Sequence, residues 1–195
     1  ELNQEEMPYF VELTTWLADR GCPVPFPFKD SNGIALKTMH NRPALLQPRL
    51  MGSHVESLTD VHCRQIGTAL AKFHQAGRDF YLQRQAHRGV FWWRRESQHI
   101  ANKLSADEAE LLRNEVDLFD QLREQPWNLP QGVIHGDLFF DNALFQGDQL
   151  SAILDIYNAC NGYLLFDLAI VANDWCVNAD GSIDSERENA LLNAY

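Results

Sequence analysis

Hydrophobic residues recur every three or four positions over several stretches of the chain, which is the spacing of one face of a helix. Residues 7–17, 66–73 and 111–122 all show this spacing. An almost unbroken apolar run at 164–177 predicts a more deeply buried helix, and the last segment of the chain is also expected to be helical. The pattern therefore predicts a mainly helical chain.

Polar residues mark the expected starts of three helices. Asn3 with Glu6, and Ser105 with Glu108, have the spacing of a capping box, in which each side chain accepts a hydrogen bond from the backbone N–H of the other residue. Thr59 is expected to cap the helix that contains residues 66–73.

Short apolar segments between the helices predict strands. Two are expected at 34–37 and 44–50. A third, at 132–135, runs into a polar loop, and two more, at 143–145 and 150–156, flank a glycine-containing turn that is typical of a hairpin. Short strands among longer helices favour an α+β fold.

Composition narrows the class of protein without identifying it. The chain has 195 residues and a mass of 22.3 kDa, and 45% hydrophobic with 22% charged residues is typical of a globular protein. Because no apolar run approaches the roughly 18 residues needed to cross a bilayer, we expect neither a membrane span nor a signal peptide. The four cysteines lack CxxC spacing, which argues against a zinc cluster or a disulfide scaffold and fits the reducing cytoplasm.

Charge is distributed unevenly along the chain. The net charge of −11 argues against nucleic-acid binding as the main function. Residues 1–103 hold 13 Lys/Arg and 10 Asp/Glu, whereas residues 104–195 hold 3 and 17. Most of these acids are expected on a solvated surface. Asp137, Asp155 and Asp167, however, lie in or beside apolar runs, where a carboxylate requires a partner or a metal.

Residues 78–103 combine arginines with aromatic side chains, a composition that could bind single-stranded nucleic acid. The interpretation that we favour is a helix that packs its Trp and Phe side chains on the core and keeps its arginines at the rim.

The most informative segment runs from His135 to Asn142, with the sequence HGDLFFDN, and Asp155 follows within ILDI. A strand end is expected to deliver Asp137 into a loop, and a hairpin to return Asp155 to the same end. Two carboxylates and one amide form an oxygen-rich site, which suits Mg²⁺ with phosphate oxygens better than zinc. A carboxylate that does not bind the metal can orient a hydroxyl group and accept its proton.

The same residues also have simpler interpretations. Asp137 and Asp155 could be structural carboxylates, since Asx-turns often follow strands. His135 is expected to be a hydrogen-bonded structural histidine, and Asp167 could do no more than favour the start of its helix.

The pattern His-Gly-Asp-x-x-x-x-Asn followed by Ile-x-Asp resembles the catalytic and metal loops of the aminoglycoside phosphotransferase and choline kinase superfamily, whose members are relatives of the protein kinases. Segments 20–25 (RGCPVP), 70–74 (LAKFH) and 166–169 (FDLA) resemble further elements of that family, in the same order. The resemblance covers about residues 15–178. It implies an α+β, protein-kinase-like fold with a mostly helical C-terminal lobe, short catalytic hairpins and part of the N-terminal lobe.

A closer resemblance is to the branch of this superfamily that phosphorylates homoserine. That branch carries HGDLFxDNxLF, DFYxACN and DLAIxxNDWC, to which residues 135–145, 155–161 and 167–176 are similar. Phe140 and Ile156 are mild departures from the pattern, and neither is at a charged position.

The resemblance implies a role for each residue of the motif. Asp137 would orient the acceptor hydroxyl and accept its proton, and Asn142 and Asp155 would bind the Mg²⁺ that bridges the phosphates of ATP. His135 and Asp167 would support the catalytic loop through hydrogen bonds. Phosphoryl transfer depends mainly on positioning and charge neutralisation, so no strong base is required.

The resemblance also implies where nucleotide and substrate bind. Residues 46–50 would form a hinge whose backbone binds adenine. Because Pro48 cannot donate a hydrogen bond, Gln47 or Arg49 is expected to do so, with Leu50 beside them. The candidates for contact with the substrate are Tyr157, Asn158, Asn161 and Asp174, the last as a partner for an ammonium group. The sequence does not single out the residue, such as an arginine, that would bind the substrate carboxylate.

Two parts are expected along the chain. Residues 1–51 would form a partial N-terminal lobe with a helix, two strands and the hinge, and residues 52–195 the catalytic and substrate-binding lobe. The glycine-rich loop and the lysine-bearing strand of this family are not found, and Glu5 or Glu6 is a candidate partner for such a cation. We therefore expect a segment of a longer enzyme, with little or no activity on its own.

The expected activity is transfer of a phosphoryl group from ATP, with Mg²⁺, to the hydroxyl of a small molecule. L-homoserine is the favoured acceptor, which would place the enzyme in threonine biosynthesis. Choline, an aminoglycoside or methylthioribose is the alternative. A catalytically silent binding module and a metal-dependent hydrolase are alternatives from other classes, but the intact Asp137, Asn142 and Asp155 argue against a silent module. Neither a nucleic acid nor a membrane is expected as a partner.

Overall fold

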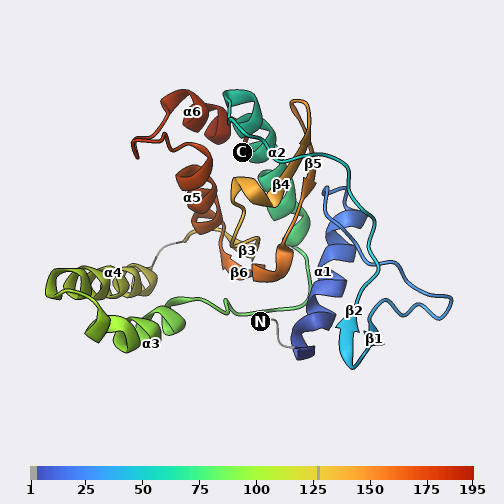
Figure 1. Ribbon diagram of the computed structural model, residues 1–195, viewed down its shortest axis with the longest axis horizontal. Helices are drawn as coiled ribbons and strands as arrows, with labels where there is room; N and C mark the ends of the chain where they lie inside the picture. The colour runs from blue at the N-terminus through green and yellow to red at the C-terminus, as the bar shows by residue number, and fades with distance from the viewer. Residues whose placement is uncertain (1–3, 127) are drawn as a thin grey trace.

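The computed structural model describes residues 4–126 and 128–195, in which helices alternate with short two-stranded sheets (Figure 1). The α-helices are α1 (Met7–Asp19), α2 (Asp60–Gly77), α3 (Val90–Ile100), α4 (Ala106–Glu124), α5 (Leu164–Trp175) and α6 (Ser185–Ala194). The strands are β1 (Lys37–Met39), β2 (Arg42–Ala44), β3 (Gln131–Ile134), β4 (Ala143–Gln146), β5 (Gln149–Ile153) and β6 (Cys160–Tyr163). Short 3-10 helices are η1 (Gln4–Glu6), η2 (Ala101–Lys103), η3 (Phe140–Asn142) and η4 (Ile156–Asn158).

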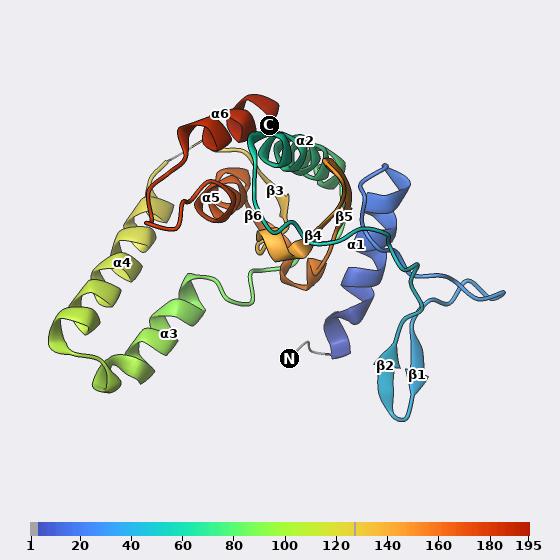
Figure 2. The ribbon, with the colours of Figure 1, turned by 45° about the horizontal axis from the view of Figure 1, so that its top comes forward.

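The sheets pair β1 with β2, β3 with β6, and β4 with β5, each antiparallel. Helices α2, α5 and α6 lie in the middle of the molecule together with β3–β6 and β4–β5 (Figures 1 and 2). The α3–α4 pair projects at one end, and α1 with the β1–β2 hairpin lies at the other. This arrangement matches the predicted α+β class.

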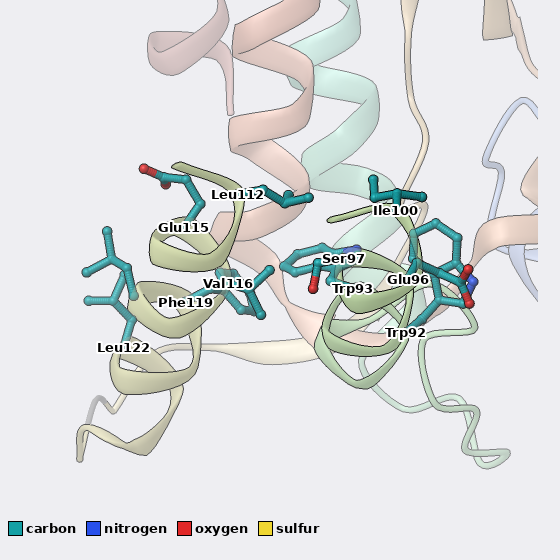
Figure 3. A pocket seen from close by; sticks show the side chains of 11 residues that line it. Trp92, Trp93, Glu96, Ser97, Ile100, Leu112, Glu115, Val116, Phe119 and Leu122 are labelled. Atoms are coloured by element: carbon teal, nitrogen blue, oxygen red, sulfur yellow. The ribbon is translucent and has the colours of Figure 1, made fainter. Parts of the chain in front are cut away.

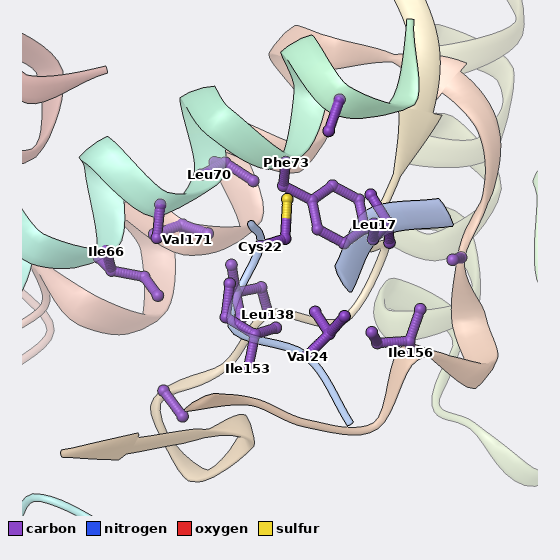
Figure 4. Packing of buried hydrophobic residues seen from close by; sticks show 14 of the residues in the cluster. Leu17, Cys22, Val24, Ile66, Leu70, Phe73, Leu138, Ile153, Ile156 and Val171 are labelled. Carbon is purple, nitrogen blue, oxygen red and sulfur yellow. The ribbon is translucent and has the colours of Figure 1, made fainter. Parts of the chain in front are cut away.

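The hydrophobic core forms where α2 meets the strand ends. Leu70 and Phe73 of α2 face Leu138 and Ile153, which lie in the loop after β3 and at the end of β5 (Figure 4). All four side chains are fully buried. Complete burial of such a side chain contributes about 1.5–3 kcal/mol, so this core fixes the loop after β3 and the end of β5 on α2.

Most predicted helices form close to their expected bounds. The Ser105–Glu108 capping box is present, with the Ser105 N–H donating to Glu108 Oε2 at 2.9 Å. Asn3 of the first predicted capping box lies outside the described residues, and α1 has Glu6 as its N-cap, with no side-chain capping bond. The Glu6 carboxylate instead accepts a hydrogen bond from Arg84 Nε at 3.0 Å.

The predicted strands at 34–37 and 44–50 are displaced. The hairpin forms over β1 and β2, because His40 and Asn41 both take positive φ (49° and 61°) and so place the tight turn between Met39 and Arg42. Residues 45–50 consequently follow the hairpin as an extended segment. The sequence also missed β6, since four residues that include Asn161 and Gly162 have little strand propensity.

A helix forms within residues 78–103 as predicted, but neither Trp93 nor Phe91 packs on the main core. Trp93 packs against Phe119 of α4 and Phe166 of α5, with ring centroids 4.8 and 6.3 Å apart, and it points toward α4 as Figure 3 shows. Phe91 is 70% exposed. Helix α3 therefore packs on α4 and α5 rather than on the main core. Over residues 4–126 and 128–195, the helices are too short or too polar to cross a membrane.

Candidate active site

The loop after β3 presents Asp137 on a backbone turn that favours glycine. Gly136 has φ +75°, and a Cβ at this position would lie only 3.2 Å from the Asn158 carbonyl oxygen. Asp137 follows it half-buried, and its Oδ2 accepts a hydrogen bond from Asn158 Nδ2 at 2.9 Å. Burial raises the pKa of the Asp137 carboxyl above its usual value, and the charge of nearby Asp155 adds to this, although the Asn158 hydrogen bond opposes it. A raised pKa makes this carboxylate a better proton acceptor.

Asn142 and Asp155 lie at adjoining ends of the β4–β5 hairpin. Ala143 pairs with Ile153, and the Leu154 N–H donates to the Asn142 carbonyl at 2.8 Å, which places Asp155 beside Asn142. Asp155 is exposed, in a left-handed conformation with φ 53°. Its neighbour Asn142 donates from Nδ2 to the backbone oxygen of Asp137 at 2.7 Å, so its Oδ1 remains available as a ligand.

These oxygen donors fit Mg²⁺. Among the described residues, no group of three or more His, Cys, Asp or Glu side chains is arranged to hold a metal ion. Mg²⁺, however, commonly uses one or two protein carboxylates and completes its coordination with phosphate oxygens and water.

Asp167, in the first turn of α5, holds the start of the catalytic loop. Its Oδ2 accepts the His135 N–H at 2.7 Å, and its Oδ1 accepts the Gly136 N–H at 2.8 Å. His74 Nε2 of α2 also lies 2.9 Å from Asp167 Oδ2. Although burial alone would raise the pKa of Asp167, the His74 hydrogen bond, the nearby imidazoles and the Gly136 N–H lower it below its usual value.

Two more residues of α5 hold the rest of the loop. Asp174 Oδ2 accepts the Phe140 N–H at 2.7 Å, and the buried Trp175 donates from Nε1 to the Leu138 carbonyl at 3.0 Å. The Asp174 carboxylate therefore has a backbone partner. Its predicted contact with a substrate ammonium group is untested.

Comparison with known proteins places this loop in a family. Residues 2–195 match the phosphotransferase enzyme family. The chain belongs to that family. The loop that α5 holds contains residues 135–142, the segment whose pattern resembles the catalytic loop of this family.

Relatives of this chain include homoserine kinases from several bacteria. The chain is 41% identical over 191 residues to homoserine kinase of Pseudomonas aeruginosa (strain UCBPP-PA14), covering 98% of this chain and 60% of the relative. It is 40% identical over 198 residues to homoserine kinase of Methylobacillus flagellatus, covering 100% of this chain and 60% of the relative. The chain thus spans about 60% of the length of these curated relatives.

Solved structures confirm the kinase-like fold. Amicoumacin kinase hAmiN, in complex with AMP-PNP, Ca²⁺ and Ami, superimposes with a TM-score of 0.76 at 15% identity, over 99% of this chain and 62% of that one. Spectinomycin phosphotransferase APH(9)-Ia, in complex with ADP and spectinomycin, gives 0.70 at 15% identity, over 97% and 64% of the two chains.

The hinge predicted at residues 46–50 leads toward the β4–β5 hairpin. Gln47 and Leu50 are half-buried and Arg49 is exposed. Just beyond them, Ser53 and Phe145 exchange two backbone hydrogen bonds of 2.9 Å, which fastens this segment to β4. The adenine contacts expected for the hinge remain predictions.

A cavity of about 380 Å³ lies beside the catalytic loop. Gly136 and Asn158 line it from the side of Asp137, and the loop at 85–89 and the start of α3 line it from the other. Asn161 also lines this cavity, but its Oδ1 accepts the Arg84 N–H at 2.8 Å. Tyr157 packs edge-on against Phe10, with ring centroids 5.3 Å apart. It is not among the described residues that line the cavity.

Sequence reasoning gave no role to three residues that support the site: His74, Trp175 and Arg84. His74 and Trp175 lie within segments 70–74 and 167–176, which resemble the family. That resemblance could have pointed to both residues. Arg84 is a buried arginine that donates to Glu6 and, from Nη1, to the Ala159 carbonyl at 3.0 Å. Arg84 therefore pairs with Glu6, one of the two glutamates that were candidate partners for a cation. Nothing in the sequence around Arg84 indicated this pairing.

Proposed function

We propose that the phosphotransferase transfers the γ-phosphoryl group of ATP to the hydroxyl of L-homoserine. The observation that carries the proposal is the convergence of Asp137, Asn142 and Asp155 at adjoining ends of β3, β4 and β5. The acceptor is supported by the homoserine kinases that are about 40% identical over nearly all of this chain. Nucleotide binding is supported by the fold, which is shared with kinases solved with AMP-PNP or ADP.

In this mechanism Asp137 is the catalytic carboxylate. Asn158 fixes its Oδ2, which leaves Oδ1 to accept a hydrogen bond from the acceptor hydroxyl. As the hydroxyl oxygen bonds to the γ-phosphorus and ADP leaves, the hydroxyl proton passes to Asp137. Asn142 and Asp155 would hold Mg²⁺, which when bound neutralises negative charge on the nucleotide phosphates. His135 and Asp167 keep the loop in place, and Gln47, Arg49 and Leu50 would border the adenine.

The test is ADP release by the full-length protein with homoserine, choline and an aminoglycoside as acceptors. We expect turnover with homoserine, and phosphorylation of only another alcohol would contradict the proposed acceptor. Asp137→Asn is expected to lower kcat by about 10²- to 10⁴-fold while leaving nucleotide affinity unchanged, because the carboxylate acts on the hydroxyl and not on ATP.

Asp141→Asn is the matched control, because Asp141 is an exposed acid of the same loop. It should keep kcat within a few fold. Equal activity of Asp137→Asn and the wild type would contradict the catalytic role of Asp137. Absence of turnover by the wild type with every acceptor would favour a catalytically silent module, and phosphate release without an acceptor would favour a hydrolase.

A further inference from the structure

The cavity beside the catalytic loop is lined by cationic side chains. Arg88, Arg123 and His87 are the basic side chains among the described residues that line it, and none of those residues is Asp or Glu. The chain as a whole has 27 Asp and Glu against 16 Lys and Arg. A cavity without carboxylates in so acidic a chain indicates a ligand that carries negative charge.

Arg88 and Arg123 differ in how far their charges are already neutralised. The Arg123 guanidinium lies 3.7 Å from Asp120 and 5.6 Å from the centroid of the Phe91 ring. Arg88 stands near the Trp92 ring, at 5.8 Å from its centroid, and forms no ion pair with any residue of the described parts of the chain. Its guanidinium is therefore free to bind a carboxylate through two parallel hydrogen bonds.

Arg88 lines the same cavity as residues of the catalytic loop. The cavity reaches the catalytic loop at Gly136 and at Asn158, whose amide is bonded to Asp137. Arg88 lines the same cavity from the loop that precedes α3. A small alcohol in this cavity can thus direct its hydroxyl to Asp137 and an anionic group to Arg88.

We infer that Arg88 determines acceptor specificity by binding the carboxylate of the substrate. The inference rests on the proposed function, since it names the group that reads the α-carboxylate of homoserine. It also predicts that cationic acceptors are disfavoured. Choline and aminoglycosides carry positive charge, which the guanidinium of Arg88 would repel.

The test is the kinetics of the full-length protein with Arg88→Gln, Arg88→Lys and the control Arg95→Gln. Arg95 is also an exposed arginine of this region, but its Nε lies 2.7 Å from Glu96 Oε1. Arg95 is not among the described residues that line the cavity. Because a hydrogen-bonded charge pair is lost, Arg88→Gln should raise the KM for homoserine about 10- to 100-fold. Arg88→Lys should recover part of that loss, and kcat and the KM for ATP should stay within a few fold. Arg95→Gln should match the wild type.

Three results would overturn the role of Arg88: an unchanged KM for homoserine, a rise in the KM for ATP instead, or equal loss with Gln and Lys together with a lower kcat. The second would show that Arg88 binds a nucleotide phosphate, and the third a merely structural role. These results are distinct from failure of the proposed function, in which the wild-type protein itself would not phosphorylate homoserine.

Discussion

Asp167 shows how one buried carboxylate supports a loop that it does not belong to. The side chain is fully buried, yet it accepts hydrogen bonds from two successive backbone N–H groups and pairs with His74. An ionised carboxylate is stable at such a site only because these donors replace its hydration. The folded state therefore favours the charged form, in agreement with the lowered pKa of Asp167.

Replacing Asp167 by Asn should make stability less dependent on pH. Since the pKa is lowered in the folded protein, the carboxylate stabilises the fold above its unfolded pKa of about 4, and this stabilisation is lost as the pH falls below that value. Asp167→Asn should lower the free energy of unfolding by about 3 kcal/mol at pH 7 and by less at pH 3.

Urea unfolding followed by circular dichroism at both pH values would measure this difference, with Asp141→Asn as the control. A difference from the wild type that stays the same at pH 7 and pH 3 would show that the charge of Asp167 does not stabilise the fold.

At this scale the family resemblance predicted roles for Asp137, Asn142, Asp155, His135 and Asp167, but the sequence could not identify the side chains that contact them. Asn158 was predicted to touch the substrate, and the structure shows that it also bonds to Asp137. His74 and Asp167 are 93 positions apart, and nothing local to either residue encodes that contact.

At the scale of elements, α5 acts as the support of the catalytic loop. Asp167 and Asp174 are seven residues apart, which is about two helical turns, so both face the loop. With Trp175 they contact residues 135, 136, 138 and 140 of the loop. A single rigid helix therefore sets the position of Asp137.

Variants of Asp174 should separate its contact with the loop from its charge. Asp174→Asn keeps an oxygen that can accept the Phe140 N–H, whereas Asp174→Ala does not. If positioning is the main role, Ala should lower kcat about tenfold, equal to about 1.4 kcal/mol for one hydrogen bond, and Asn should lower it far less. Steady-state kinetics of the full-length protein would measure both. An equal rise in the KM for homoserine with both variants would instead favour the predicted ammonium contact.

Element boundaries were predicted well where capping residues or turn glycines mark them, as at Ser105 and in the β4–β5 turn. The β1–β2 hairpin was misplaced because its turn uses His40 and Asn41 at positive φ, with no glycine to mark it. Strand β6 depends on pairing with β3 rather than on its own propensity.

At the scale of the whole molecule, the α3–α4 pair is joined to the body by an aromatic contact. Trp93, Phe119 and Phe166 come from α3, α4 and α5, and their ring centroids lie 4.8–6.3 Å apart. The projecting pair also forms one wall of the cavity that holds Arg88. The geometry of that wall thus depends on this contact.

Trp93→Ala should loosen the α3–α4 pair selectively. Loss of the aromatic contacts should increase hydrogen exchange of α3 and α4 amides about tenfold or more, because aromatic pairs contribute about 0.5–1.5 kcal/mol beyond the area that they bury. Exchange in α2 should not change. Phe91→Ala is the matched control, since Phe91 is on the same helix but 70% exposed. Uniformly faster exchange across the molecule would show that Trp93 stabilises the whole fold instead.

The Asp167 contacts also bear on the order in which the chain can fold. They join α2, the loop after β3 and α5 across separations of 93 and 32 residues. Contacts between residues so distant in sequence form late, because the entropy of closing the intervening loops is lost before they stabilise anything. The hairpins of residues 131–163 hold the residues of the catalytic motif, but without α5 the N–H groups of His135 and Gly136 have no acceptor. We therefore expect the site to be among the last parts of the molecule to become native.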